Sequence, residues 1–158
     1  MKVTWDFSEL IDFANKMKDT SSLEMHLENA TREIAKALRT RIKGYTPALD
    51  YDLIHAWDDN KFLVTETTNG YEVILVNKMD YAIYVNDGHR QRPGRFIPGY
   101  WANRRRFVYD PHSTTGMVLS KSWVQGRFFV EKGIASMTST SEIEQIIMQE
   151  LQKWWDSI

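Results

Sequence analysis

The segment from Leu23 to Ile42 constrains the fold more than any other part of this 158-residue chain. Its apolar side chains recur at steps of three and four residues, the period of an α-helix that buries one face. Cationic side chains follow near its end, where they complement the helix dipole, and Gly44 is a typical helix stop. The pattern predicts a long amphipathic helix that begins after Ser21 or Ser22. Its buried positions are expected to be Leu23, Leu27, Ala30, Ile34, Leu38 and Ile42.

Two further helices are predicted, one on each side of the long helix. Asp6 and Glu9 resemble a capping box, in which free amides of the first turn stabilise an acid at the third helical position. A short helix is therefore expected over 7–17. A serine or threonine at 139–141 would cap a terminal helix with apolar residues at helical spacing. These residues are Ile143, Ile146, Ile147, Leu151, Trp154 and Ile158.

Residues 61–68 and 71–77 predict two strands of a hairpin. The joining dipeptide Asn69-Gly70 is a strong turn signal, because both residues tolerate positive φ. Apolar residues on both faces of the second strand indicate burial on both sides. Upstream, Thr46-Pro47 breaks the helical pattern because proline lacks an amide hydrogen. Residues 50–57 are then expected to form one or two helical turns.

The chain is less regular after this hairpin. Residues 81–85 predict either a third short strand or a helical turn, since periodicity does not separate the two over so short a run. Residues 88–104 hold two prolines and three glycines and predict a long irregular loop, a kind of segment that tends to be functional. Residues 107–109 and 117–119 predict a second hairpin, and 124–130 a further strand.

Together these segments predict an α+β fold with N-terminal helices, a central and mostly antiparallel sheet with a long arginine-rich loop, and a C-terminal helix. A chain of this length can bury about 70% of its unfolded surface in one core. We expect a single domain over 1–158, with 88–122 as a loop or hairpin excursion. The charged start lacks the apolar stretch of a secretory leader, and the longest apolar run, 81–85, is too short to span a membrane.

The residues offer little support for catalysis. The chain has no cysteine, no Gly-x-Ser-x-Gly elbow and no phosphate loop, so we expect no enzyme activity and no cofactor. Carboxylates and one imidazole between residues 50 and 59 could hold a divalent ion, as in a metal-dependent nuclease. The favoured interpretation is a solvated segment whose aspartates cap a helical turn, without a metal. The residues concerned are Asp50, Asp52, His55, Asp58 and Asp59.

A net charge of −1 hides a strong segregation of charge along the chain. Six arginines and no acid lie between Gly88 and Tyr109, interleaved with aromatic residues. Arginines with neighbouring aromatics can contact phosphates and stack on bases, or they can meet carboxylates of the same chain or of a neighbouring subunit. We favour protein contact or plain solvation over nucleic acid. The candidate partner-binding residues here are Arg90, Arg92, Arg95, Tyr100, Trp101, Arg104, Arg105 and Arg106.

Trp154 and Trp155 are adjacent near the end of the predicted terminal helix. Neighbouring side chains on a helix point about 100° apart, so the two rings cannot both face one core. Trp155 is therefore a candidate interface anchor, because tryptophan is enriched at interface hot spots. The alternative is that both rings pack under a loop.

Three segments, in the same order and spacing over residues 20–155, resemble the tail-completion or head–tail joining proteins of long-tailed bacteriophages and prophages. Thr46-Pro47, followed by Leu53 and Trp57, is similar to their Thr-Pro-x-x-Thr-Gly-x-Leu-x-x-x-Trp segment, with Asp50-Tyr51 in place of Thr-Gly. The stretch 77–90 resembles Asn-x-x-x-Tyr-Ala-x-Tyr-Val-Glu-x-Gly-His-Arg, with Asn86 in place of glutamate. The stretch 123–129 resembles Trp-Val-x-Gly-x-Phe-Met.

The resemblance implies a structural virion protein at the tail or the head–tail junction, made in the host bacterial cytoplasm and lacking catalytic activity. It implies a homo-oligomeric ring that contacts other connector and tail proteins, with no membrane, and whose arginines could also contact DNA in the lumen. Gly88 is expected to adopt positive φ where the chain leaves the 77–90 signature. The alternative function is a small nucleic-acid-binding protein that uses the arginines and aromatics of 88–107.

Overall fold

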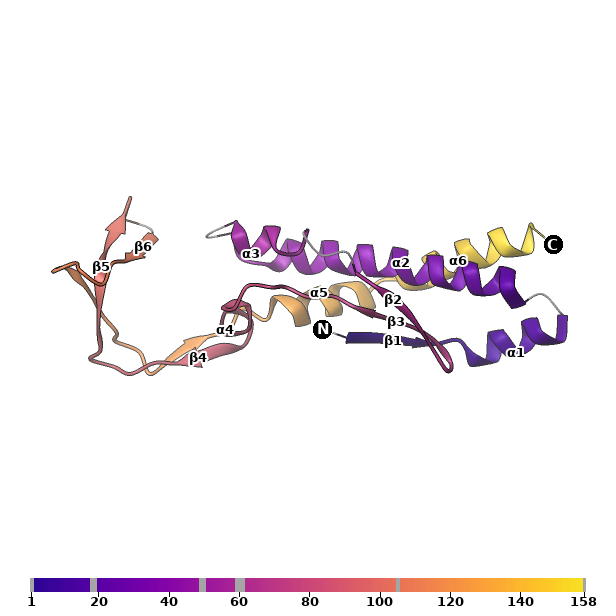
Figure 1. Cartoon of the computed structure of the whole chain (residues 1–158), viewed down its shortest axis with the longest axis horizontal. Helices are drawn as coiled ribbons and strands as arrows, with labels where there is room; N and C mark the ends of the chain where they lie inside the picture. The colour runs from indigo at the N-terminus through magenta and orange to yellow at the C-terminus, as the bar shows by residue number, and fades with distance from the viewer. Residues whose placement is uncertain (1, 18–19, 49–50, 59–61, 105, 158) are drawn as a thin grey trace. The chain divides into compact units, whose positions relative to one another are not determined.

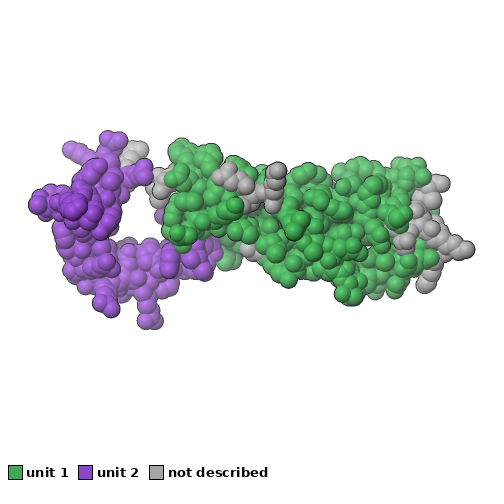
Figure 2. Space-filling model, viewed as in Figure 1, with its two compact units in different colours: residues 1–82, 128–158 green, residues 83–127 purple. Residues whose placement is uncertain are grey.

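The chain forms two compact units in the computed structural model (Figures 1 and 2). One unit comprises residues 1–82 and 128–158, and the other comprises residues 83–127. We call the second the inserted unit and the first the main unit. The structure describes residues 2–17, 20–48, 51–58, 62–104 and 106–157.

Helix α2 (Thr20–Tyr45) is the longest element of the main unit and confirms the predicted amphipathic helix, although it begins at Thr20, so Ser21 and Ser22 lie inside it and do not cap it. All six apolar positions expected to be buried are at most 4% exposed. The helix runs through Gly44 by one residue, so this glycine is not its stop. Instead the helix ends where Thr46 donates from both its amide and its hydroxyl to the carbonyl of Ile42, at 3.0 and 2.8 Å.

Three other helices pack against α2 in the main unit (Figure 1). They are α1 (Ser8–Met17), α5 (Phe129–Thr138) and α6 (Glu142–Trp155). Helices α1 and α6 confirm the predicted flanking helices, while Ile158 lies outside the described residues. Arg41 on α2 donates to the Glu142 carboxylate at 2.6 and 2.9 Å and to Ser136 Oγ at 2.7 Å. This arginine therefore ties α2 to the junction of α5 and α6.

Helix α5 corrects the strand predicted over 124–130. The strand β8 (Trp123–Gln125) is short, and Phe129 already begins the helix. Phe129, Gly133 and Met137 are four residues apart and buried, so they form one helical face. A Cβ on Gly133 would lie 2.5 Å from Ile42 Cγ1 and 2.8 Å from Ile42 Cα. The missing side chain thus lets α5 approach the backbone of α2.

An antiparallel sheet with strand order β1-β3-β2 completes the main unit. Strands β2 (Val64–Thr67) and β3 (Gly70–Ile74) confirm the first hairpin, but Thr68 and Asn69 form its turn and Gly70 already pairs with Thr67. Strand β1 (Lys2–Asp6), which was not predicted, pairs with the other edge of β3. Helix α3 (Asp52–His55) confirms the helical turn predicted within 50–57.

The inserted unit replaces the predicted long loop with strands. Strand β4 (Gly88–Arg90) pairs with β8, and a second sheet has the order β6-β5-β7. Its members, all antiparallel, are β5 (Phe96–Ala102), β6 (Arg106–Tyr109) and β7 (Gly116–Val118). The predicted second hairpin is wrong, because β6 and β7 both pair with β5, which lies between them. Helix α4 (Ala82–Asp87) settles the open choice at 81–85 in favour of a helix.

Pro98 and Gly99 explain why β5 looks like a loop in sequence. The carbonyl of Pro98 accepts from Asp110 N at 3.2 Å, an interaction that needs no proline amide hydrogen. A Cβ on Gly99 would lie 2.1 Å from Val108 O, so the glycine is required by the close approach of β6. Both apparent breakers therefore fit inside a strand. The α+β class holds, with antiparallel sheets and a C-terminal helix.

Gly88 has a φ of 83°, which confirms the expected positive value. A side chain would be strained there, and a Cβ would also lie 2.4 Å from Val124 O. The glycine thus permits both the turn out of α4 and the pairing of β4 with β8. In the described part of the chain, no helix combines the length and apolar character needed to cross a membrane.

Candidate functional site

The two units carry opposite net charge. The inserted unit holds eight Lys and Arg residues against the two acids Asp87 and Asp110, a net charge of +6. The remaining residues hold twelve Lys and Arg against nineteen Asp and Glu, a net charge of −7. The charge segregation noted in the sequence therefore coincides with the division into units. An excess of one sign in so small a unit raises its potential for oppositely charged partners.

Five exposed arginines of the inserted unit are not neutralised locally. Within the described residues, none of these five forms an ion pair with a carboxylate. Both acids of the unit accept local hydrogen bonds instead: Asp87 Oδ1 from Asn86 Nδ2 at 2.7 Å, and Asp110 Oδ1 from His112 N at 3.0 Å. Arg105 lies outside the described residues. The arginines concerned are Arg90, Arg92, Arg95, Arg104 and Arg106.

A hollow of about 520 Å³ lies beside β4 and brings three of the predicted arginines together. Its wall is held by backbone hydrogen bonds from Gly94 N to Leu119 O at 2.8 Å and from Leu119 N to Arg95 O at 2.9 Å. Three guanidinium groups, an amide and no carboxylate give this hollow the chemistry of an anion site. It is lined by His89, Arg90, Gln91, Arg92, Arg95 and Leu119.

His89 is a polar residue of this hollow that sequence reasoning did not select. Its Nδ1 is buried and has no hydrogen-bond partner among the described residues, while its Nε2 lies 3.3 Å from Gln91 Nε2. The ring of Tyr84 packs edge-on against it, with centroids 5.9 Å apart. The Gly-His-Arg signal was visible in the sequence, but only the pairing of β4 with β8 places this histidine at the hollow.

The β5–β6 hairpin exposes aromatic rings on both faces. Trp101 lies opposite Phe107 and packs edge-on against it at 5.4 Å, whereas Tyr100 is opposite Val108 and points to the other face. The Tyr100 and Trp101 side chains remain 51% and 54% exposed. Of the predicted site residues, these two thus share one hairpin with Arg104 and Arg106.

The turn of this hairpin places an arginine in an unfavourable backbone conformation. Asn103 and Arg104 have φ values of 50° and 57°, in the left-handed region. Asparagine visits this region readily, but for a residue such as arginine it costs on the order of 1 kcal/mol relative to glycine. Observed strain of this kind clusters at functional positions.

Trp155 belongs to the main unit, apart in the chain from the arginines. It is 60% exposed at the end of α6, whereas Trp154 is 3% exposed in the core. Sequence reasoning missed Met148, which is 63% exposed and lies seven residues before Trp155 on the same face of α6. The seven-residue spacing is the signal that could have found it. The role of Trp155 as an interface anchor stays a prediction.

The region proposed for a divalent ion forms other contacts. Asp58 accepts a hydrogen bond from Lys43 Nζ, which holds the pKa of that carboxyl below its usual value. In the described ranges, no three His, Cys, Asp or Glu side chains are grouped so that they could hold a metal. Asp50 and Asp59 lie outside those ranges.

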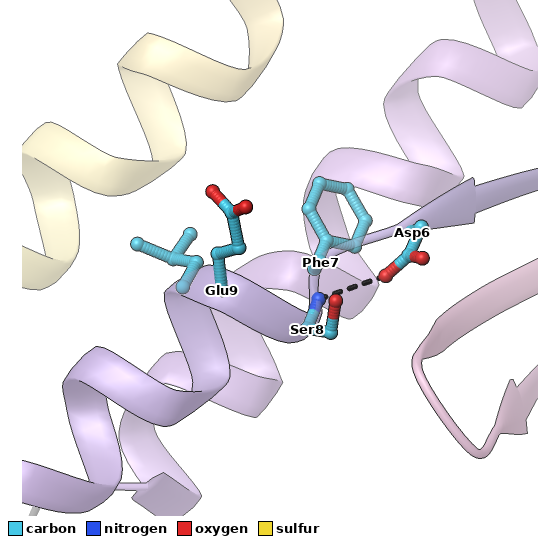
Figure 3. A pocket seen from close by; sticks show the side chains of 5 residues that line it. Asp6, Phe7, Ser8 and Glu9 are labelled. Atoms are coloured by element: carbon cyan, nitrogen blue, oxygen red, sulfur yellow. Dashed lines mark hydrogen bonds between the residues drawn. The ribbon is translucent and has the colours of Figure 1, made fainter.

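A second hollow, around the start of α1, has a structural explanation (Figure 3). Asp6 Oδ1 accepts a hydrogen bond from Ser8 N at 2.9 Å, and this bond lowers the pKa of Asp6. The Glu9 side chain points away from this bond in Figure 3. The hollow therefore surrounds the start of a helix. The predicted capping box is wrong, because α1 begins at Ser8 and Asp6 accepts from the Ser8 amide and not from that of Glu9.

Comparison with known proteins finds two relatives in Bacillus subtilis (strain 168). An uncharacterized protein, YqbI, is 35% identical over 103 residues, and the protein XkdI of the phage-like element PBSX is 28% identical over 99 residues. Each match covers 61% of this chain, but 59% of the first relative and 58% of the second, which is less than two thirds of either. No family model and no solved structure matches the chain. The chain is thus similar to a protein of a phage-like element.

Proposed function

We propose that this chain is a structural protein of a tailed phage or prophage, which completes the tail or joins it to the head connector. The observation that carries the proposal is the similarity to XkdI of the phage-like element PBSX. The protein acts through protein–protein contacts, without catalysis, on other connector and tail proteins. It is made in the host bacterial cytoplasm and becomes part of the virion.

The charge distribution supports assembly of copies into a ring. Head-to-tail contacts join two different surfaces, one from each copy, and close into a ring when the rotation allows it. A unit of +6 and a unit of −7 within one chain supply two such surfaces of opposite sign. Exposed Trp155 and Met148 add apolar area of the kind that interface cores use.

Deletion of the gene from the phage or prophage that encodes it tests the proposal. After induction, electron microscopy should show filled heads and tails that are not joined, and a plasmid copy of the gene should restore joined particles. Joined, infectious particles in the deletion strain would contradict the proposal. As a control for expression, the uncomplemented strain should still produce normal amounts of the major capsid protein.

Native mass spectrometry of the purified protein, without nuclease treatment, tests the ring. A closed oligomer, with or without bound nucleic acid, supports it and gives the number of subunits. If the protein stays a monomer after the purified neighbouring connector protein has been added, the ring is contradicted.

A further inference from the structure

We propose that the inserted unit binds the phosphate backbone of a nucleic acid, through the arginines of the hollow and of the β5–β6 turn. This goes beyond the structural role proposed above, which requires protein partners alone. Figure 2 shows the inserted unit in purple.

The inserted unit carries uncompensated charge. Its net charge is +6, and within the described residues five of its arginines make no ion pair: Arg90, Arg92, Arg95, Arg104 and Arg106. Its two acids accept hydrogen bonds from Asn86 and His112, and neither pairs with one of these arginines. A cluster of unpaired cations on one small unit is the electrostatic footprint of a nucleic-acid-binding surface.

The arginines fall into two groups. Arg90, Arg92 and Arg95 line the hollow, while Arg104 and Arg106 lie at the β5–β6 turn. Guanidinium groups bind phosphate oxygens through bidentate hydrogen bonds. A polymer with one phosphate per nucleotide can satisfy both groups at once, whereas a single small anion would occupy one of them.

The backbone is strained at Arg104. Glycine would fit its φ of 57° without strain, yet the chain carries the largest cationic side chain there. Arg104 lies two residues before Arg106 in sequence and two residues after the end of β5, the strand that bears Tyr100 and Trp101. Because strain of this kind clusters at functional positions, it supports a role of Arg104 in ligand binding.

The aromatic residues complete the surface. Tyr100 and Trp101 are about half exposed on opposite faces of the hairpin, so each ring has a free area on which a base can stack. An acidic protein would meet the same charges but has no planar bases for these rings. The combination of unpaired arginines and exposed rings therefore favours nucleic acid over an acidic protein surface.

Fluorescence anisotropy with the full-length protein tests the proposal. The probes are a labelled DNA of about 30 nucleotides, as a single strand and as the matching duplex. Binding is measured at salt concentrations from 50 to 200 mM. If about six phosphates are neutralised, the affinity should fall on the order of 10³-fold across this range. In Arg104→Ala/Arg106→Ala, loss of two phosphate contacts should weaken binding and reduce the slope of log affinity against log salt by about 1.8 for the duplex. Absence of binding at 50 mM salt would overturn the proposal.

The matched control is Arg32→Ala/Lys36→Ala. This variant removes the same charge from α2, where both cations already pair with Glu28 and Glu33. Its DNA affinity should equal that of the unchanged protein. An equal loss in both double variants would mean that net charge alone acts, and would overturn the assignment to the inserted unit.

Two further measurements keep the test decisive. Arg104→Gly relieves the backbone strain, so it should fold at least as well as the unchanged protein and still lose about one phosphate contact from the salt slope. Polyglutamate of similar length should compete poorly with DNA, and competition as strong as that of unlabelled DNA would favour an acidic protein partner instead.

The two forms of DNA are distinguished by Tyr100→Leu. If a single strand is the ligand, loss of a stacked base should weaken single-strand binding on the order of tenfold, while the affinity for the duplex stays the same. Equal affinities of the variant and the unchanged protein for both forms identify the duplex. Neither result bears on the joining of heads to tails, so the two proposals fail independently.

Discussion

His26 on α2 and Glu150 on α6 form a buried hydrogen-bonded pair, with 3.0 Å between His26 Nδ1 and Glu150 Oε2. The two residues are 9% and 7% exposed. Lys153 Nζ, one turn further along α6, bonds the other carboxylate oxygen of Glu150. The carboxylate is therefore held between two cationic or hydrogen-bonding groups, at the place where the terminal helix meets the longest helix of the main unit.

This arrangement predicts a loss of stability in acid. Burial acts to raise the pKa of Glu150, but hydrogen bonds from Lys153 and His26 outweigh it, so the pKa lies below its usual value. A carboxyl whose pKa is lowered by folding stabilises the native state above the unfolded pKa, and that contribution is lost as the pH falls through the folded value. Urea unfolding between about pH 6 and pH 3 should show this loss, and Glu150→Gln should show a smaller one. Parallel pH profiles for the two proteins would contradict it.

Gly133→Ala should destabilise the main unit. The new Cβ would lie under 3 Å from the backbone of Ile42, so α2 and α5 must move apart. Overpacking of this kind typically costs about 1–3 kcal/mol, measurable by urea unfolding. Gly44→Ala is the matched control, because a Cβ there meets nothing within 4 Å and lies inside α2, so it should be neutral or stabilising. Equal effects of the two substitutions would rule out a close helix contact at Gly133.

Trp155→Ala should impair particle assembly without affecting the fold. The side chain is 60% exposed, so its removal should leave the melting temperature nearly unchanged, while complementation of the deletion strain should fail or weaken. Trp154→Ala is the contrasting variant. It removes a ring that is 3% exposed, and about 3–5 kcal/mol of stability should be lost. Full complementation by Trp155→Ala would show that Trp155 does not contribute to the interface.

The elements that could be predicted from the sequence are those whose signals are local. Helices α2 and α6 follow from a one-sided apolar period, and the β2–β3 hairpin follows from its turn residues. Strand β1 was missed because its pairing with β3 joins residues about 70 positions apart, which no local pattern reveals.

The inserted unit was mistaken for a loop for a physical reason. Proline and glycine usually interrupt strands. Here Pro98 and Gly99 fit inside one because of tertiary contacts, since β6 approaches Gly99 too closely for a side chain. Helix α5 was missed because residues 124–130, which include its first two residues, resemble a strand. The arginines were identified as candidates from composition, yet their lack of ion pairs within the described residues and the strained backbone of Arg104 required the structure.

The Thr-Pro segment with its later tryptophan has a direct structural explanation. Thr46 Oγ1 donates to Ile42 O at 2.8 Å and accepts from the buried indole of Trp57 Nε1 at 3.1 Å. This hydroxyl both ends α2 and fixes the helical turn of α3, which explains the eleven-residue spacing of the two residues.

Thr46→Val keeps the shape of the side chain but removes its oxygen. The indole N–H of Trp57 would then be buried without a partner, which should cost about 1–3 kcal/mol. Thr40→Val is the matched control, because Thr40 makes the same bond to the carbonyl four residues earlier, Lys36 O at 2.9 Å, but is exposed. Urea unfolding should therefore separate the two variants, and the difference between them measures the bond to Trp57. If both lose the same stability, the threonine acts through its helical bond alone, and the spacing of Thr46 and Trp57 needs another explanation.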